Sequence, residues 1–393
     1  MQPLSETIAR LTALRGGGRD RIAASDQLQP LGEFGSNPGN LGAWMHVPDK
    51  VGEGLPLVVV LHGCTQNAAG YDQDSGWSQL ADEFGFALLY PEQRRANNAN
   101  LCFNWFEPGD TRRGAGEALS IVQMVETMIR KHAINRSRIF VTGLSAGGAM
   151  TSVMLATYPD IFAGGAIIAG LPFGAAANVQ QALERMRGVG GAGGLALAAA
   201  VRSAAPPPRR WPKISIWHGT ADHVVAPSNA DASLVQWQSV HGLLGAAHRT
   251  EAIGGHTRRV WLDAEGEAVI EDYRIRGMGH GTPLATTGAQ ACGQAGPHML
   301  EAGISSTRCV ADSWKLTGQQ RRPAAQRSAA TCAGAAAAPI PGVAEILHRG
   351  TQDRPGPSYP AGARPAGLRP ASLARVDVGK VIDDALRAAG LVR

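Results

Sequence analysis

The sequence predicts an α/β fold in which a mostly parallel central sheet carries helices on both faces. Strand-like segments alternate with segments of helical periodicity along much of the chain, the order typical of strand-helix-strand units. Residues 57–61 form a continuous apolar run, as expected of a strand buried on both faces. With 393 residues and 44% hydrophobic content, the chain is long enough to bury a full core.

The elements follow one another at short intervals. Strands are predicted where β-branched and apolar residues cluster between turn-forming residues, and helices where apolar residues recur every three or four positions. The expected elements, in chain order, are strands over 41–48 and 57–61, a helix near 75–84, a strand over 87–90, a helix near 115–132, strands over 138–142 and 164–169, a strand from 211 that ends in a polar turn, and a strand over 268–275.

Both ends of the chain lie outside the main domain, which we place at 41–318. Residues 1–40 form an N-terminal extension, whose apolar residues predict a short amphipathic helix over 4–15. Residues 319–372 are rich in Ala, Pro and Arg, which indicates a linker and a largely disordered C-terminal tail. Helical periodicity returns within residues 373–393, at Val378, Val381, Ile382, Leu386 and Ala389, and predicts a terminal helix for docking or self-association.

A serine lies in a strand-to-helix turn near the middle of the chain. Residues 143–147 read Gly-Leu-Ser-Ala-Gly and directly follow the β-branched strand over 138–142. This is the sequence of a nucleophile elbow, where the serine occupies a strained turn and its neighbours must be small. The helix that follows would direct its free amides and its positive dipole end toward Ser145. The context predicts a nucleophilic serine and an α/β-hydrolase fold.

A nucleophilic serine needs a base and a group that orients the base, and in α/β hydrolases these follow in the order acid, then histidine. Asp222 comes just after the strand that begins near 211, and His280 lies in a glycine-rich loop after the strand over 268–275. The carboxyl ends of such strands are where ligands bind. Ser145, Asp222 and His280 are therefore the predicted catalytic triad.

The buried strand over 57–61 runs into His62-Gly63-Cys64. A loop of this type supplies one backbone amide to the oxyanion of an acyl-transfer reaction, and the residue after the nucleophile supplies another. We expect the amides of Cys64 and Ala146 to form the oxyanion hole. His62 is expected to shape the loop through a side-chain hydrogen bond rather than to act as a general base.

Taken together, these motifs resemble the esterases of the poly(3-hydroxybutyrate) depolymerase family, a family that also contains feruloyl and acetylxylan esterases. The resemblance covers about residues 40–317. It rests on HGCTQN at 62–67, YP at 90–91, NWF at 104–106, GLSAGG at 143–148, WHGTAD at 217–222 and GHG at 279–281. It implies a carboxylic ester hydrolase that works through an acyl-enzyme, with Ser145 as nucleophile, Asp222 as acid and His280 as base, and without a cofactor.

The most specific expectation for the substrate is a short-chain poly- or oligo-hydroxyalkanoate ester. Feruloyl or acetylxylan esters remain an alternative, and a non-catalytic granule-binding protein on the same fold is a remote one. Trp105 and Trp217 are expected to line the acyl groove, although Trp217 is alternatively a packing residue beneath the acid turn. The insertion over 178–210 either covers the active site as a lid or is a passive surface excursion.

Five cysteines cannot all pair with one another. Relatives of the chain suggest a disulfide between Cys64 and Cys102, which would join two active-site loops. Cys292 and Cys309 form a second candidate pair, while in a reducing compartment all five would be thiols. No cysteine or histidine pair has the spacing of zinc ligands, so no metal site is expected.

Charge is unevenly distributed. The formal net charge is +5. From Gln319 onward 11 basic and 5 acidic residues give +6, which leaves the preceding residues near −1. A nearly neutral catalytic domain suits an uncharged ester and lacks the basic surface expected of a nucleic-acid-binding protein. The basic tail could instead contact the surface of a polymer granule.

There is no apolar run long enough for a membrane span and no secretory signal at the start, so a cytoplasmic location is expected, or a secreted one if the sequence is a mature form.

Overall fold

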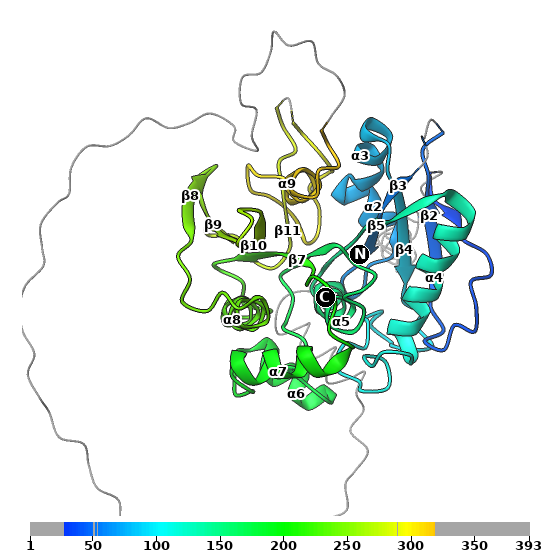
Figure 1. The fold of residues 1–393 in the computed structure, drawn as a ribbon. Coiled ribbons are helices and arrows are strands. Elements are labelled where there is room, and N and C mark those ends of the chain that lie inside the picture. The colour runs from blue at the N-terminus through cyan, green and yellow to red at the C-terminus, as the bar shows by residue number, and fades with distance from the viewer. Residues whose placement is uncertain (1–26, 50–51, 53, 289, 319–393) are drawn as a thin grey trace, which may run out of the picture.

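The computed structural model describes residues 27–49, 52, 54–288 and 290–318. These residues form one α/β domain (Figure 1). The helices predicted over 4–15 and 373–393 and the linker predicted over 319–372 lie outside the described residues. None of the helices in the described ranges is both long and apolar enough to cross a membrane.

The central sheet has ten strands in the order β1-β2-β4-β3-β5-β6-β7-β10-β9-β8. The strands from β4 to β10 in this order run parallel, and antiparallel strands are added at both edges. The predicted parallel sheet is thus confirmed at its centre. The strands are β1 Gln29–Pro30, β2 Gly42–His46, β3 Leu55–Leu61, β4 Ala87–Glu92, β5 Ile134–Leu144, β6 Gly164–Ile168, β7 Lys213–Gly219, β8 Arg249–Ile253, β9 His256–Leu262 and β10 Ala268–Ile275.

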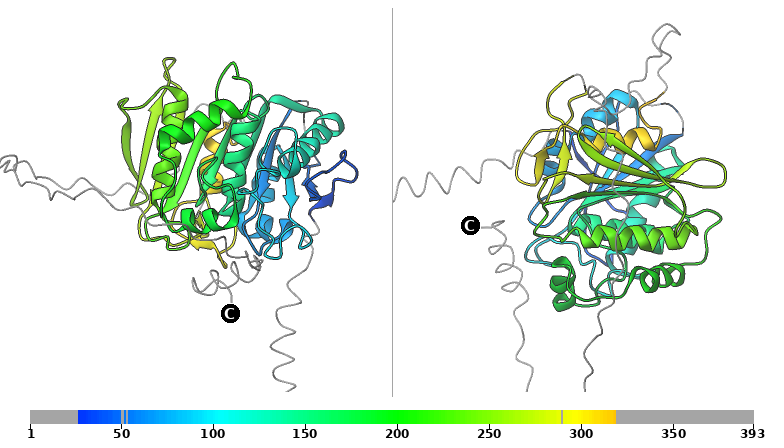
Figure 2. Two further views of the ribbon diagram at one scale, coloured as in Figure 1. Left: turned by 90° about the horizontal axis from the view of Figure 1, so that it is seen from below. Right: turned by 90° about the vertical axis from the view of Figure 1, so that its left-hand side faces the viewer.

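Helices cover both faces of the sheet, and the right-hand view of Figure 2 looks along the sheet with helices on either side. Alternate residues of β3 belong to two different cores, because successive side chains of a strand point to opposite faces. Val58 and Val60 pack in the core that contains residues of α2, α3 and α9, whereas Leu57, Val59 and Leu61 pack in the core with α4, α5, α7 and α8. The helices are α2 Ala68–Ser75, α3 Trp77–Phe84, α4 Gly116–His132, α5 Ala146–Thr157, α6 Val179–Met186, α7 Gly194–Ala204, α8 Ser228–His241 and α9 Ser306–Ser313.

Some elements differ from the predictions. The helix expected near 75–84 is confirmed as α3, but a further helix, α2, precedes it, and Gly76 separates the two with a left-handed φ of 74°. The hairpin β8–β9, which turns at Gly254 and Gly255 with φ of 56° and 81°, was not predicted. The fold also begins before residue 41, since β1 pairs with β2 and Leu31 is buried.

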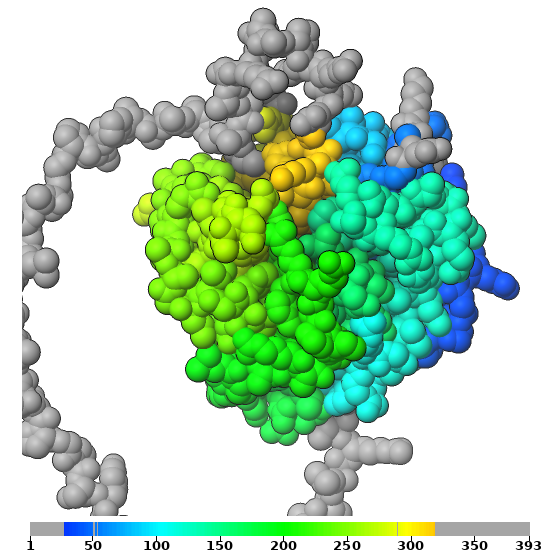
Figure 3. All heavy atoms as spheres, in the orientation of Figure 1, coloured from blue at the N-terminus to red at the C-terminus, as the bar shows by residue number. Residues whose placement is uncertain are grey.

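The last described segment closes the domain. In Figure 3 residues 300–318, coloured gold, lie between the strands β8–β10 and the N-terminal half of the chain. Within this segment Trp314 stacks on Phe140 of β5 at a ring distance of 4.7 Å and on Trp77 of α3 at 6.2 Å. A small parallel pair of strands, β11 Thr282–Leu284 and β12 Met299–Glu301, connects this segment to the loop that carries His280.

Candidate active site

Ser145 occupies a strained turn between β5 and α5. Its φ of 57° and ψ of −116° are rare for a residue with a side chain. The turn is held by its backbone, because the amide of Ser145 donates to the carbonyl of Ile168 at 2.9 Å and the carbonyl of Ser145 accepts from the amide of Ala149 at 2.8 Å. This is the geometry of a nucleophile elbow, as the sequence predicts.

The glycines around Ser145 are required by close backbone contacts. A Cβ atom at Gly147 would lie 2.5 Å from the carbonyl oxygen of His62 and would also meet that of Leu61. A Cβ atom at Gly143 would lie 2.5 Å from the backbone of Gly147. Only glycine lets the elbow approach the end of β3 this closely.

His280 and Asp222 are joined by a hydrogen bond of 2.8 Å between Nδ1 and Oδ2. The other carboxylate oxygen accepts from the amides of Val224 and Val225, each at 2.9 Å. Burial alone would raise the pKa of Asp222, but the hydrogen bond and charge of His280 and the amide of Val225 outweigh it and hold the pKa below its ordinary value. Asp222 is therefore ionised near neutral pH and fixes the Nδ1–H tautomer of His280.

A second histidine supports the acid. His218 is buried and its Nε2 donates to the carbonyl of Val225 at 2.8 Å, while lying 3.4 Å from Oδ2 of Asp222. Burial lowers the pKa of His218, so the ring is neutral near pH 7. His218 thus helps to hold the Asp222 turn without adding a charge.

Within residues 63–65, in the loop after β3, one backbone amide has no hydrogen-bond partner in the described part of the chain. The amide of Gly63 donates to Oε1 of Gln66 at 2.8 Å, and the amide of Thr65 donates to the carbonyl of Asn100 at 2.7 Å. The amide of Cys64 lies between them. The amide of Ala146 is the first of α5 and has no partner within the helix. Both predicted oxyanion donors are available.

Two contacts hold this loop in place. Cys64 and Cys102 form a disulfide, the pair that relatives of the chain suggest. His62 is buried; its Nδ1 donates to the carbonyl of Gly63 at 2.7 Å and its Nε2 accepts from the amide of Gln93 at 3.1 Å. Burial lowers the pKa of His62. His62 therefore shapes the loop as a neutral ring, as predicted.

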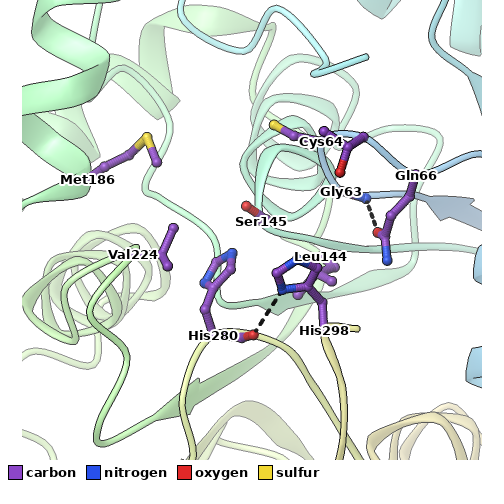
Figure 4. Close-up of a pocket in the computed structure, with 10 residues that line it drawn as sticks. Gly63, Cys64, Gln66, Leu144, Ser145, Met186, Val224, His280 and His298 are labelled. Carbon is purple, nitrogen blue, oxygen red and sulfur yellow. Dashed lines mark hydrogen bonds between the residues drawn. The ribbon is translucent and has the colours of Figure 1, made fainter. Parts of the chain in front are cut away.

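A pocket of about 430 Å³, counted out to open solvent, lies over Ser145. Figure 4 shows Met186 and Val224 on one side of Ser145 and Gln66 and His298 on the other. The sequence analysis assigned roles to Cys64, Ser145 and His280 but none to these four residues, which come from separate parts of the chain. The lining residues are Gly63, Cys64, Thr65, Gln66, Leu144, Ser145, Met186, Val224, His280 and His298.

The insertion over 178–210 divides into two parts. Its first helix, α6, ends at Met186, which reaches the pocket. Its second helix, α7, packs on α8, where Nε2 of Gln236 donates to the carbonyl of Leu197 at 3.0 Å. Only the α6 end of the insertion is therefore placed to cover bound substrate.

The two tryptophans predicted to line the acyl groove do not line this pocket. Trp217 is 1% exposed, stacks on Tyr273 at 3.6 Å, and donates from Nε1 to Oγ of Ser215 at 2.8 Å. Trp105 is 8% exposed and packs edge-on against Phe106 at 5.4 Å. Trp105 therefore packs in the hydrophobic core instead of lining this pocket. For Trp217 the structure agrees with the alternative expectation, a packing residue beneath the turn that carries Asp222.

The predicted disulfide between Cys292 and Cys309 is also wrong: both are buried and neither is in a disulfide. The Sγ atom of Cys292 donates weakly to the carbonyl of Gly76 at 3.4 Å, against the junction of α2 and α3. Cys309 packs in the core beside α9. Each acts as a small packing residue.

Comparison with known proteins agrees with this geometry. Residues 43–260 match the esterase PHB depolymerase family, a range that includes Ser145 and Asp222 and ends before His280. The chain is 46% identical over 295 residues to poly(3-hydroxyalkanoate) depolymerase C of Paucimonas lemoignei, covering 74% of this chain and 70% of that protein.

More distant relatives act on other esters. Feruloyl esterase B of Thermothelomyces thermophilus is 34% identical over 270 residues, covering 66% of this chain and 89% of that protein. The solved acetyl xylan esterase of Aspergillus awamori superposes with a TM-score of 0.59 at 28% identity, covering 64% of this chain and 93% of that one. The chain therefore belongs to the esterase PHB depolymerase family and is a carboxylic ester hydrolase.

Proposed function

We propose that this enzyme hydrolyses short-chain poly- or oligo-hydroxyalkanoate esters through an acyl-enzyme on Ser145. The observation that carries the chemistry is the hydrogen-bonded pair of His280 and Asp222 beside a serine in a strained elbow. The substrate class is supported by the 46% identity to a poly(3-hydroxyalkanoate) depolymerase, against 34% to a feruloyl esterase.

The reaction follows from these positions. His280 takes the proton of Ser145 as the hydroxyl oxygen attacks the ester carbonyl, and Asp222 stabilises the resulting imidazolium. The amides of Cys64 and Ala146 hold the negative oxygen of the tetrahedral intermediate. His280 then gives its proton to the leaving alcohol, and a water activated by the same ring releases the acyl group.

The pocket walls favour a small aliphatic ester. Met186 and Val224 offer an apolar side, and no Phe, Tyr or Trp is among the lining residues. A feruloyl group would gain most from an aromatic wall on which to stack, whereas the methyl branch of a short hydroxyacid needs only aliphatic contact. The lining residues therefore favour a hydroxyalkanoate ester over a feruloyl ester as the substrate.

Replacing the nucleophile tests the chemistry. The Ser145→Ala enzyme should lose at least about 10³-fold in kcat yet remain folded, with His280→Ala similar and Asp222→Asn slightly more active, because the triad acts as a unit. Circular dichroism and the melting temperature provide the control for folding. Near wild-type activity of Asp222→Asn would show that another carboxylate orients His280.

A substrate panel tests specificity. Hydroxybutyrate oligomers and amorphous polymer should be hydrolysed with higher kcat/KM than methyl ferulate or acetylated xylan. Turnover of short p-nitrophenyl esters is used to normalise these rates for the amount of active enzyme. Faster turnover of methyl ferulate than of the oligomers would assign the enzyme to the alternative class.

We further propose that the basic C-terminal segment raises the amount of enzyme at a polymer surface. This rests on the charge of +6 from Gln319 onward, since anionic end groups at such a surface attract cations. Truncation after Gly318 should leave turnover of soluble short esters nearly unchanged and weaken binding to polymer particles. Equal particle binding by the full and truncated chains would remove this proposal.

A further inference from the structure

His298 lines the pocket but has no part in the proposed reaction. It directly precedes β12, just as the loop with His280 directly precedes β11, and the two strands pair in parallel with Thr282 opposite Met299. The pairing brings the two imidazoles together, with ring centroids 5.9 Å apart at an interplanar angle of 72°. His298 is therefore a second imidazole at the edge of the reaction site.

The backbone holds His298 in a fixed place. Its φ of 61° lies in the left-handed region, which a residue with a side chain adopts at a cost. The carbonyl of His298 accepts from the amide of Thr282 at 2.8 Å, and a Cβ atom at Gly281 would lie 2.7 Å from the same oxygen. Such strain is kept only where the surroundings enforce it, and it is often found at ligand sites.

The hydrogen bond of the ring determines its tautomer. Nδ1 of His298 lies 3.4 Å from the backbone carbonyl of His280, the contact drawn in Figure 4. A carbonyl oxygen only accepts, so Nδ1 carries the hydrogen and Nε2 carries a lone pair. Burial and the neighbouring His280 lower the pKa of His298, which keeps the ring neutral near pH 7.

Nε2 of His298 is thus a hydrogen-bond acceptor at the pocket wall, and it has no protein donor among the described residues. The group that satisfies it must come from water or substrate. Ester oxygens are acceptors only and cannot pair with it. Along a hydroxyalkanoate chain the one neutral donor is the free hydroxyl of the terminal unit, which lies on the acyl side of the first ester bond.

We infer that Nε2 of His298 binds the free 3-hydroxyl of the terminal hydroxyacyl unit, so that the enzyme prefers to cleave oligomers at their hydroxyl end. The inference rests on the proposed function for its choice of substrate. It makes His298 a specificity-determining residue. An interior ester lacks the hydroxyl and gains nothing from this contact.

A pair of matched esters isolates the contact. Methyl 3-hydroxybutyrate and methyl 3-methoxybutyrate differ in whether the 3-oxygen carries a hydrogen or a methyl group, so only the first can donate a hydrogen bond from this oxygen. For the wild type kcat/KM should be about 5–30-fold higher for the hydroxy ester, the worth of one hydrogen bond to an otherwise unpaired group. His298→Phe keeps a ring of similar size without an acceptor and should bring the ratio close to one, whereas His298→Gln, which keeps an acceptor oxygen, should restore part of it.

Two controls separate specificity from loss of structure. His248→Phe makes the same exchange at an exposed histidine that stacks on Trp261, and it should keep the wild-type ratio. The melting temperature and the pH profile of kcat/KM on the methoxy ester should be similar in the wild type and in His298→Phe, because His280 and Asp222 are untouched.

The outcomes distinguish this inference from the proposed function. An equal loss on both methyl esters in His298→Phe, or a wild-type ratio near one, would overturn the role of His298 while leaving ester hydrolysis by Ser145 intact. Conversely, an enzyme that prefers methyl ferulate to hydroxybutyrate oligomers would refute the proposed substrate class, and the ratio of the two methyl esters would still measure what His298 recognises.

Discussion

The two sides of the pocket are held by different kinds of contact. The serine side, residues 62–66 and 143–148, is enclosed by backbone atoms and joined to a second loop by the disulfide of Cys64. The histidine side, residues 277–282 with Asp222, is open at two of its three glycines. A Cβ atom at Gly277 or Gly279 would meet nothing within 4 Å, whereas one at Gly281 would lie 2.7 Å from the carbonyl oxygen of His298. Its position depends on the hydrogen bond to Asp222 and on the pairing of β11 with β12.

The serine side is thus positioned mainly by close steric contacts, and the histidine side mainly by hydrogen bonds. On the serine side the oxyanion amides must be aligned before substrate arrives, because preorganised donors need no rearrangement during the reaction. On the histidine side the ring exchanges protons with Ser145, the leaving alcohol and water in turn, and the hydrogen bond that Nδ1–H of His280 donates to Asp222 orients it. We expect mutations to affect the two sides unequally.

The largest contrast is expected between two glycine-to-alanine changes. Gly147→Ala places a methyl group against the carbonyls of Leu61 and His62 and should destabilise the protein by more than about 3 kcal/mol or prevent folding. Gly279→Ala should change stability by less than about 1 kcal/mol. Thermal and urea unfolding of the two variants check this. Equal destabilisation would show that the loop of His280 is packed as tightly as the elbow.

The next effect is expected at Glu117, a buried carboxyl of α4 that contacts the serine side through Gln93, whose amide donates to Nε2 of His62. Glu117 accepts from Nε2 of Gln93 at 2.5 Å and from the amide of Asn104 at 2.9 Å. Burial, with the charge of Asp110 adding, raises its pKa to about 8. The folded protein then holds a proton that the unfolded chain has released, so stability should fall with a slope of up to about 1.4 kcal/mol per pH unit between pH values of about 4.5 and 8.

Glu117→Gln removes this titration. Its free energy of unfolding should vary less with pH over the same window, while wild type and variant converge at lower pH, where both side chains are neutral. Urea unfolding at a series of pH values measures the slopes. Parallel curves for the two proteins would show that Glu117 does not retain its proton in the folded state.

Removal of the disulfide should affect the same side more mildly. Cys64 and Cys102 close a loop with a sequence separation of 38, and the bond should contribute about 2–4 kcal/mol. The Cys64→Ser/Cys102→Ser variant keeps the amide at position 64 but should lose this stability and part of kcat. The wild type in reductant is the matched control. A thiol count of five in denatured, oxidised wild type would contradict the pairing.

The smallest effect is expected at Trp217, which packs beneath the turn that carries Asp222. Trp217→Phe keeps a ring against Tyr273 but loses the hydrogen bond to Ser215, which should cost about 1 kcal/mol. Because Trp217 does not line the pocket, KM for short esters and for hydroxybutyrate oligomers should be unchanged. A raised KM for oligomers alone would restore Trp217 as a substrate-binding residue.

The two sides of the pocket also differ in how the sequence predicts them. The elbow at Ser145 was predictable because its constraint is local: a β-branched strand, small residues and a helix occur within one short segment. Asp222 and His280 were predictable because strands of a parallel sheet end at one edge, so polar turns after them meet there. The hairpin β8–β9 also had a local signal, the Gly254-Gly255 pair between two β-branched segments, which sequence reasoning did not use.

Only the tertiary structure determined which side chains face the pocket. Trp105 and Trp217 lie next to functional motifs in the sequence, yet both rings turn into the core, since burying a large aromatic surface outweighs a place at a groove. Cys292 and Cys309 are buried in one hydrophobic core without a disulfide, and their spacing in the sequence did not show this. His298 reaches the pocket because β11 pairs with β12, a contact between distant residues that no local pattern encodes.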